Sequence, residues 1–409
     1  MTRRSLAMFA GVGACMLLYA MLGSAQTQSS DRAPQSHLKD DCGLSHFCGV
    51  PYKFVPPAKP PSPADGAGWQ SGSGVNLVNG VAVQVGGTAG WGEVCWGSPI
   101  CAWRSGPNTI HVVHTPNMGY TYAYPLEFPA GTTGGVTGIA INSKDHIFAF
   151  VRTAPGQPQL YEWDENHKFV RAFGVNIAGK SHALSIDAAD NLWVCDQFGD
   201  TVMKLSPEGK LLQTFGVKGE RGDWNEAKGQ RLLWQPLDVA FAANGDVYIG
   251  MGHGNESPND GAARVLHLDK DGKFVNQWFG NANGPGKFGM VHGIAVDPKT
   301  GEVYIADREE YRIVVYTGDG KFVKTIQEPN LVCALFFDSH DQLWMATGQD
   351  GQIAKLDKDG NIVGAAGVGS GRGPGQFIES NYIVTDAHGD LYVGDTSQTR
   401  ITEMIPPAQ

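Results

Sequence analysis

The chain has 409 residues, of which 55 are glycine and 23 are proline, and only 18% are charged, with a formal net charge of −10 at pH 7. Glycine at about twice its usual ~7% share favours many tight turns, and no apolar stretch beyond the N-terminus has the length and period of a helical bundle. Lysine and arginine are scattered rather than clustered, which argues against nucleic acid as a partner.

Residues 1–25 have the composition of a signal peptide. Arg3 and Arg4 form a positively charged start, residues 6–22 are apolar, and Gly23–Ala25 offers small residues for cleavage. No later stretch is long and apolar enough to span a bilayer. We therefore expect an exported protein, periplasmic or extracellular, with no membrane span.

Residues 26–70 are rich in Pro, Ser and Gly, which predicts a flexible leader. Residues 71–130 form an N-terminal extension that does not match the rest of the chain. Two cysteine pairs in these regions, Cys42 with Cys48 and Cys95 with Cys101, share a C-x5-C spacing. In an exported protein this spacing favours two local disulfides. Free thiols are the alternative, and the sequence does not give the connectivity.

From about Gly134 onward one pattern recurs six times: a turn, then alternating aromatic and aliphatic residues, then usually a small residue and an acid. The copies begin at His146, Asn191, Asp246, Glu302, Gln342 and Asp390, so they are 45, 55, 56, 40 and 48 residues apart. This is the period of a four-stranded propeller blade. The sequence therefore predicts an all-β, six-bladed β-propeller over residues 131–409, following an N-terminal extension.

The last repeat has no room for a complete fourth strand before the chain ends. We expect residues 119–128, just before the first repeat, to supply the missing strand and to cover an edge that would otherwise be exposed.

The first strands of the six blades should line a central channel, because they are the innermost strands of a propeller. Alignment of the repeats places six residues at one level of that channel: Thr137, His182, Leu237, His292, Cys333 and Asn381. His182 and His292 come from alternate blades and could share a metal. The alternative is a structural, hydrogen-bonded pair. Asn381 completes the threefold spacing, although an amide is a poor zinc ligand, and the Cys333 thiolate is another candidate third ligand.

A second level lies at the ends of the second strands. Arg152 and Arg308 occupy equivalent positions in blades one and four, and His253 lies one residue later in blade three. A guanidinium at a channel mouth could bind a carboxylate through two hydrogen bonds. The alternative is that each arginine pairs with an acid of its own loop, such as Asp307 or Glu309.

The segment Phe279–Phe288, continued by His292–Asp297 and Val303–Arg308, resembles an NHL repeat. More narrowly, residues 134–405 resemble the peptidyl-α-hydroxyglycine α-amidating lyases, or peptidylamidoglycolate lyases, which are six-bladed NHL propellers. The resemblance implies a channel zinc held by three histidines, two substrate-facing arginines and a tyrosine near the metal. His182 and His292 match two of those histidines, and Arg152 and Arg308 match the arginines.

Two positions depart from that family. Asn381 and Tyr382 stand where the family has its third histidine and a following aspartate, and His253 stands where the family has its tyrosine. Since that aspartate belongs to the family's calcium site, the resemblance does not support calcium here.

The implied function is that of a carbon–nitrogen lyase that depends on zinc or another divalent transition metal. It would split a peptidyl α-hydroxyglycine, or a related small molecule or peptide with a carboxylate, into an amide and glyoxylate, with His253 as general base. The second hypothesis is a non-catalytic NHL propeller that binds a ligand or a protein partner. The sequence does not decide between an enzyme and a binding scaffold.

Overall fold

The structure is a computed structural model that describes residues 118–252, 263–280, 285–328 and 330–408, with the backbone alone at Glu309. It also describes the backbone of six short strands between residues 52 and 114. The expected signal peptide, the pair Cys42 and Cys48, and His253 lie outside the described residues.

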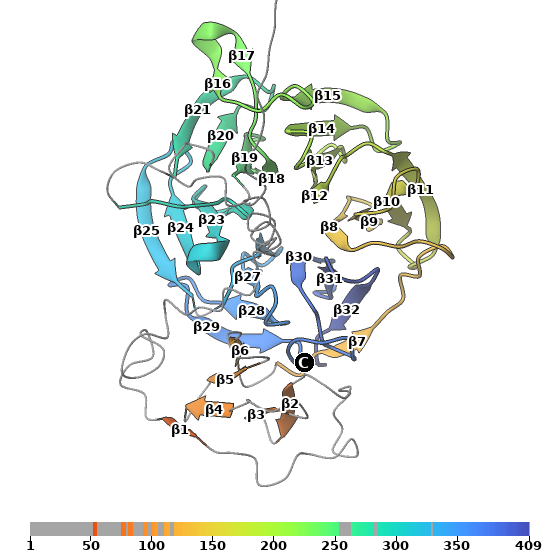
Figure 1. The fold of residues 1–409 in the computed structure, drawn as a ribbon, viewed down its shortest axis with the longest axis vertical. Helices are drawn as coiled ribbons and strands as arrows, with labels where there is room; N and C mark the ends of the chain where they lie inside the picture. Colours follow the sequence, from red (N-terminus) through yellow and green to blue (C-terminus); the bar gives the residue numbers. More distant parts are fainter. Residues whose placement is uncertain are drawn as a thin grey trace, which may run out of the picture.

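Six four-stranded antiparallel sheets are arranged around a central axis as the blades of a propeller, which confirms the predicted fold class (Figure 1). In each blade the first strand lies innermost and the later strands follow outward in chain order, except for the outermost strand of blade six. Blades one to three comprise β8 (Val136–Ile141), β9 (Ile147–Val151), β10 (Pro158–Trp163) and β11 (Phe169–Val175); β12 (Ser181–Ile186), β13 (Leu192–Asp196), β14 (Thr201–Leu205) and β15 (Leu211–Phe215); and β18 (Pro236–Phe241), β19 (Val247–Met251), β20 (Arg264–Leu268) and β21 (Phe274–Phe279).

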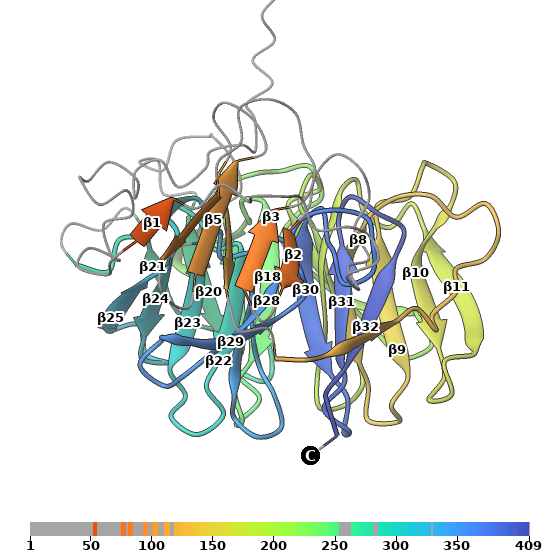
Figure 2. The same ribbon diagram turned by 90° about the horizontal axis from the view of Figure 1, so that it is seen from below.

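Blades four to six follow the same plan. They comprise β22 (Gly293–Val296), β23 (Val303–Asp307), β24 (Arg312–Tyr316) and β25 (Phe322–Gln327); β26 (Ala334–Phe337), β27 (Leu343–Ala346), β28 (Ile353–Leu356) and β29 (Ile362–Ala366); and β30 (Ser380–Thr385), β31 (Leu391–Asp395) and β32 (Ile401–Ile405). Seen from the side, the strands run across the thickness of the ring (Figure 2).

The fourth strand of blade six is β7 (Thr121–Ala123), which comes from the segment before blade one. It pairs antiparallel with β32, so that Tyr122 lies opposite Met404 and Thr121 opposite Ile405. This is the ring closure that the sequence predicted.

Burial along the strands follows from the packing of blade against blade. The second strands β13, β19, β23 and β31 are buried at every residue, whereas the outermost strands β15 and β25 are mostly exposed. The Asp-x-Asp-Gly segments form tight hairpin turns, as their composition predicts. The Asp269 carboxylate accepts the backbone N–H groups of Asp271 and Lys273, and Gly272 takes φ +78°, a conformation that favours glycine.

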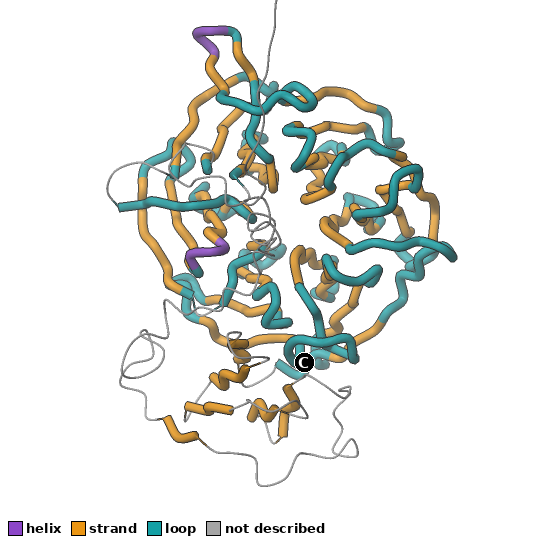
Figure 3. The backbone as a smooth tube through the Cα atoms, in the orientation of Figure 1, coloured by secondary structure: helices purple, strands orange, loops and turns teal. Residues whose placement is uncertain are grey.

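The other elements lie outside the four-stranded sheets of the ring. A small hairpin of β16 (Trp224–Asn225) and β17 (Gln230–Arg231), with the 3-10 helix η3 (Glu226–Lys228) between them, follows β15, and η4 (Arg308–Glu310) follows β23 (Figure 3). Strands β1 (Tyr52–Phe54), β4 (Glu93–Trp96), β5 (Ile100–Arg104) and β6 (Ile110–His114) form a sheet, and β2 (Val75–Val78) pairs with β3 (Val81–Gln84). Within the described residues no helix is long and apolar enough to cross a membrane.

The expected disulfide between Cys95 and Cys101 concerns two residues of which only the backbone is described. The backbone register of β4 and β5 places Cys95 opposite Cys101. The disulfide itself stays a prediction.

Candidate functional site

Four of the six inner strands, β8, β12, β18 and β30, begin at a β-bulge, a place where two residues of one strand oppose one residue of its neighbour. In blade four, the His292 N–H donates to the Ala306 carbonyl oxygen at 3.0 Å, while Gly293 is the residue in register with Ala306. A bulge changes the direction of a side chain and often lies beside a functional site. The residues at the six equivalent positions are all buried: Thr137, His182, Leu237, His292, Cys333 and Asn381.

The structure brings His182 and His292 together in the channel. Their ring centroids are 4.8 Å apart and the rings are inclined by 71°. The Nδ1 atom of His182 lies 2.8 Å from the Leu237 carbonyl oxygen, and Nδ1 of His292 lies 2.7 Å from the Cys333 carbonyl oxygen. Because a carbonyl oxygen only accepts hydrogen bonds, Nδ1 must carry the proton in both rings. The lone pair that can bind a metal is therefore on Nε2.

This geometry fits two imidazoles that share one metal ion. With Zn–N bonds of ~2.0–2.1 Å, each ring centroid lies about 3.2 Å from the metal, and a tetrahedral angle separates the two centroids by about 5 Å. The observed separation is 4.8 Å. Metal-binding histidines generally donate their other N–H to a carbonyl or carboxylate, as both do here.

The third position of the predicted metal site is Asn381 of blade six, which is buried at the same level. Among the described residues no group of three His, Cys, Asp or Glu side chains is placed to hold a metal. The Cys333 sulfur accepts a hydrogen bond from Nε of Arg308 at 3.2 Å. The candidate donor set is thus two imidazoles and one amide.

Tyr382 follows Asn381 and contacts the histidine pair. Its hydroxyl donates to the Leu237 carbonyl oxygen at 3.0 Å and lies 3.0 Å from Nδ1 of His182. Burial, with a further contribution from nearby Asp238, raises the pKa of this phenol well above its ordinary value. Calcium prefers carboxylate and carbonyl oxygens. A neutral phenol does not fit that role.

Three buried aspartates hold the loops that lead into the metal level. Asp196, Asp307 and Asp395 end the second strands of blades two, four and six. Asp196 Oδ1 accepts the N–H groups of Gly179 and Lys180, which lie three and two residues before His182. Asp307 binds the loop before His292 in the same way, and Asp395 the loop before Asn381. The sequence identified these acids only as part of the repeat. Their recurrence at the same place in blades two, four and six is the signal that could have singled them out.

The two predicted arginines lie at equivalent places at the channel mouth. Nε of Arg152 donates to the Ser181 carbonyl oxygen at 3.0 Å, and Nη2 of Arg308 pairs with Glu379 Oε1 at 2.7 Å. The alternative pairing of Arg308 with Asp307 is wrong, because Asp307 pairs with Arg312 instead. The Glu309 side chain lies outside the described part of the chain.

Lys180 was missed by sequence reasoning, although it stands two residues before His182. Burial and the neighbouring Arg152 lower the pKa of its amine to about 8, against the opposing effect of Glu379. Burial also lowers the pKa of Arg152, and Glu379 again opposes the shift. The mouth therefore gathers the side chains of Arg152, Lys180 and Arg308 around one carboxylate, Glu379. This excess of positive charge favours an anionic ligand.

Comparisons with known proteins agree with this architecture. A family model described as a 6-bladed beta-propeller matches residues 259–362. Mus musculus peptidyl-glycine alpha-amidating monooxygenase is 30% identical over 231 residues, covering 47% of this chain and 22% of that protein. Homo sapiens NHL repeat-containing protein 3 is 28% identical over 238 residues, covering 54% of this chain and 63% of that protein. A probable peptidyl-alpha-hydroxyglycine alpha-amidating lyase of Caenorhabditis elegans is 26% identical over 220 residues, covering 46% of this chain and 57% of that protein.

The chain is thus a six-bladed β-propeller related to amidating enzymes and to NHL repeat-containing protein 3. It spans less than two thirds of the length of each of these relatives. Among solved structures, a gluconolactonase of Xanthomonas campestris superposes with a TM-score of 0.50 at 15% identity, covering 71% of this chain and 91% of that one. At that identity the likeness concerns the fold alone.

Proposed function

We propose that this protein is an exported, metal-dependent carbon–nitrogen lyase of the amidating-lyase type, acting on a peptide or small molecule that carries a carboxylate beside a hydroxylated carbon. The observation that carries the proposal is the imidazole pair of His182 and His292, held 4.8 Å apart with both Nδ1 atoms bonded to backbone carbonyls. The distant relationship to the amidating enzymes supports the same reaction class.

In this proposal His182 and His292 hold zinc or another divalent transition metal, with Asn381 as the third protein ligand. When bound, the metal supplies a Lewis acid that polarises an oxygen of the substrate. Arg152 and Arg308 hold the substrate carboxylate by charge-assisted hydrogen bonds. A base takes the proton of the α-hydroxyl group, the carbon–nitrogen bond breaks, and the amide nitrogen regains a proton, leaving an amide and glyoxylate.

Two residues are candidates for the base. His253 is the candidate that the sequence gives, and it lies outside the described residues. Lys180 is the candidate that the structure adds, because an amine whose pKa is lowered to about 8 is partly neutral near physiological pH.

The test measures metal content and glyoxylate release together. Purified protein, loaded with zinc and assayed on a peptidyl α-hydroxyglycine, should release glyoxylate, and His292→Ala should lose both bound metal and turnover. His267→Ala is the matched control. His267 is a buried histidine of β20 that pairs with Asp246, away from the channel, so its loss should leave metal content unchanged. Metal-loaded protein without turnover would contradict the lyase.

A binding propeller without catalysis is the second candidate. It is favoured by one observation: the described residues contain no complete cluster of three strong metal ligands. Protein that binds the carboxylate ligand but holds no metal and releases no glyoxylate would support this function.

A further inference from the structure

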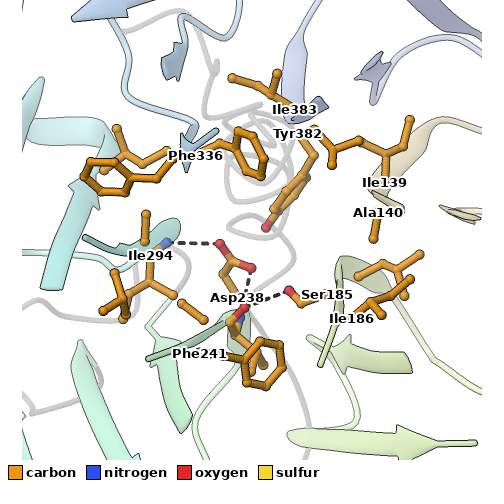
Figure 4. A pocket seen from close by; sticks show the side chains of 18 of the residues that line it. Ile139, Ala140, Ser185, Ile186, Asp238, Phe241, Ile294, Phe336, Tyr382 and Ile383 are labelled. Carbon is orange, nitrogen blue, oxygen red and sulfur yellow. Dashed lines mark hydrogen bonds between the residues drawn. The ribbon is translucent and has the colours of Figure 1, made fainter. Parts of the chain in front are cut away.

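The channel continues beyond the histidines as a separate cavity of about 250 Å³. All six inner strands contribute to its wall, with residues that follow the bulge level along each strand (Figure 4). Its volume is just below the ~300 Å³ at which drug-sized pockets begin, so a ligand of this cavity must be small. Nothing in the proposed lyase reaction uses this space.

Tyr382 separates the cavity from the metal level. It projects from blade six and reaches the Leu237 carbonyl oxygen in blade three, on the opposite side of the ring. Because this hydrogen bond crosses the channel, a ligand on the far side of the ring meets the tyrosine and not the histidines. The two halves of the channel can therefore have different occupants.

The side chains that line the cavity are apolar except for those of Ser185, Asp238 and Tyr382. Ile186, Phe241 and Phe336 belong to the wall, whereas Asp238 presents a carboxylate, with the Tyr382 hydroxyl pointing toward it (Figure 4). Asp238 is only 5% exposed. Its two oxygens accept the N–H groups of Val239 at 2.8 Å and Ile294 at 3.0 Å. No lysine, arginine or histidine within the described residues forms an ion pair with it.

A buried carboxylate without a counter-ion is energetically costly, and this cost raises the pKa of Asp238 to about 7. A carboxylate has about four lone-pair positions. The two backbone donors leave room for two more hydrogen bonds, which a protonated amine can supply. Phe241 and Phe336 also line the cavity, and an aromatic ring beside an ammonium group stabilises it.

The outer rim of the cavity has the same preference for positive charge. Four of the inner strands, β12, β22, β26 and β30, are each followed directly by an aspartate. These residues are Asp187, Asp297, Asp338 and Asp386. Each of these carboxylates is fixed by backbone N–H groups of its own hairpin. Asp187 also pairs with Lys204 at 2.9 Å, whereas Asp297, Asp338 and Asp386 form no ion pair within the described residues. A cation that approaches this face therefore meets negative charge from these three carboxylates.

We propose that this half of the channel is a second binding site, which takes a small alkylammonium ion. The nitrogen pairs with the Asp238 carboxylate and the alkyl chain packs against the apolar inner strands.

The test uses butylammonium as the probe, with butanol as its neutral analogue, on the full-length protein. Isothermal titration calorimetry at pH 8 should show butylammonium binding at least tenfold more tightly than butanol, and Asp238→Asn should remove that preference. Asp246→Asn is the matched control, because Asp246 pairs with His267 outside the channel. This control variant should bind butylammonium like the wild type.

Asp238→Asn places an amide where two backbone donors point, so a folded variant must be verified by thermal unfolding. A second measurement does not depend on that variant. The carboxyl carbon of Asp238, followed by NMR in the wild type, should show its pKa falling when butylammonium is added and not when butanol is added. Tyr382 and Cys195 are the other titratable groups near Asp238, and burial raises the pKa of both, so they stay neutral in this range. Equal binding of butanol and butylammonium, or an unchanged Asp238 titration, would overturn the proposal.

Discussion

Tyr382 and His182 are 200 residues apart in the sequence, and the structure places the tyrosine hydroxyl 3.0 Å from the histidine Nδ1. Both groups bond to one acceptor, the carbonyl oxygen of Leu237. Blades two, three and six therefore meet at a single carbonyl in the middle of the channel. The orientation of the His182 ring depends on a residue that stands where the amidating-lyase pattern has an acid.

Replacing Tyr382 with phenylalanine tests this dependence. We expect Tyr382→Phe to lower the free energy of unfolding by about 1 kcal/mol, the usual net value of one hydrogen bond. Metal affinity should fall by about tenfold, because a group that orients a ligating histidine is lost. Competition with a chelator measures the affinity. Tyr248→Phe, which removes a similar hydroxyl-to-carbonyl bond at Gly318, is the control and should leave metal binding intact.

Glu379 occupies the place that a bound carboxylate would take beside Arg308. Glu379→Gln removes this internal negative charge, so we expect the affinity for a carboxylate ligand to rise several-fold, whereas Arg308→Ala should weaken it. Calorimetry with a peptide acid and the matching peptide amide checks both effects. If Glu379→Gln binds the acid no better than the wild type does, Glu379 does not compete with the ligand.

The buried aspartates that hold the loops should matter far more than similar aspartates in exposed turns. Asp196→Ala leaves the buried N–H group of Gly199 and the partly buried N–H groups of Gly179 and Lys180 without their acceptor. We expect a loss of about 3 kcal/mol in the free energy of unfolding, together with weaker metal binding. Asp357→Ala removes similar bonds from an exposed hairpin, where water replaces them, and should cost under about 1 kcal/mol. Urea denaturation of the two variants provides the comparison.

Glu328 gives the protein a stability that falls as the pH rises. Burial raises the pKa of this carboxyl to about 8 in the folded state, so the folded protein holds a proton that the unfolded chain has already released. The free energy of unfolding should therefore decrease from about pH 4.5 to about pH 8 and level off above that.

In Glu328→Gln this decrease should be smaller, and the variant should be more stable than the wild type at pH 8 by an amount on the order of 3 kcal/mol. Thermal unfolding measured at several pH values tests the effect. Parallel curves for the wild type and the variant would mean that Glu328 does not hold the proton.

The repeating second-strand pattern was enough to predict six blades, their closure and the level at which His182 and His292 meet. The reason is physical: β8, β12, β18 and β30 have the same bulge at the same place, so equivalent residues stay at one height. Glu379 could not be found in this way, because its contact with Arg308 joins blade six to blade four across 71 residues. Asp238 was missed because one aspartate in an apolar strand does not reveal the cavity beside it.

The pairing of β7 with β32 has a consequence for how the chain is made. A ribosome releases Thr121–Ala123 long before Ile401–Ile405, so β7 must wait through the synthesis of five complete blades before its partner strand exists. The final sheet is therefore the last part of the ring that can form during translation. A nascent chain halted anywhere before β32 carries an unpaired strand at one end and an uncovered blade at the other, which makes such fragments targets for chaperones and prone to association.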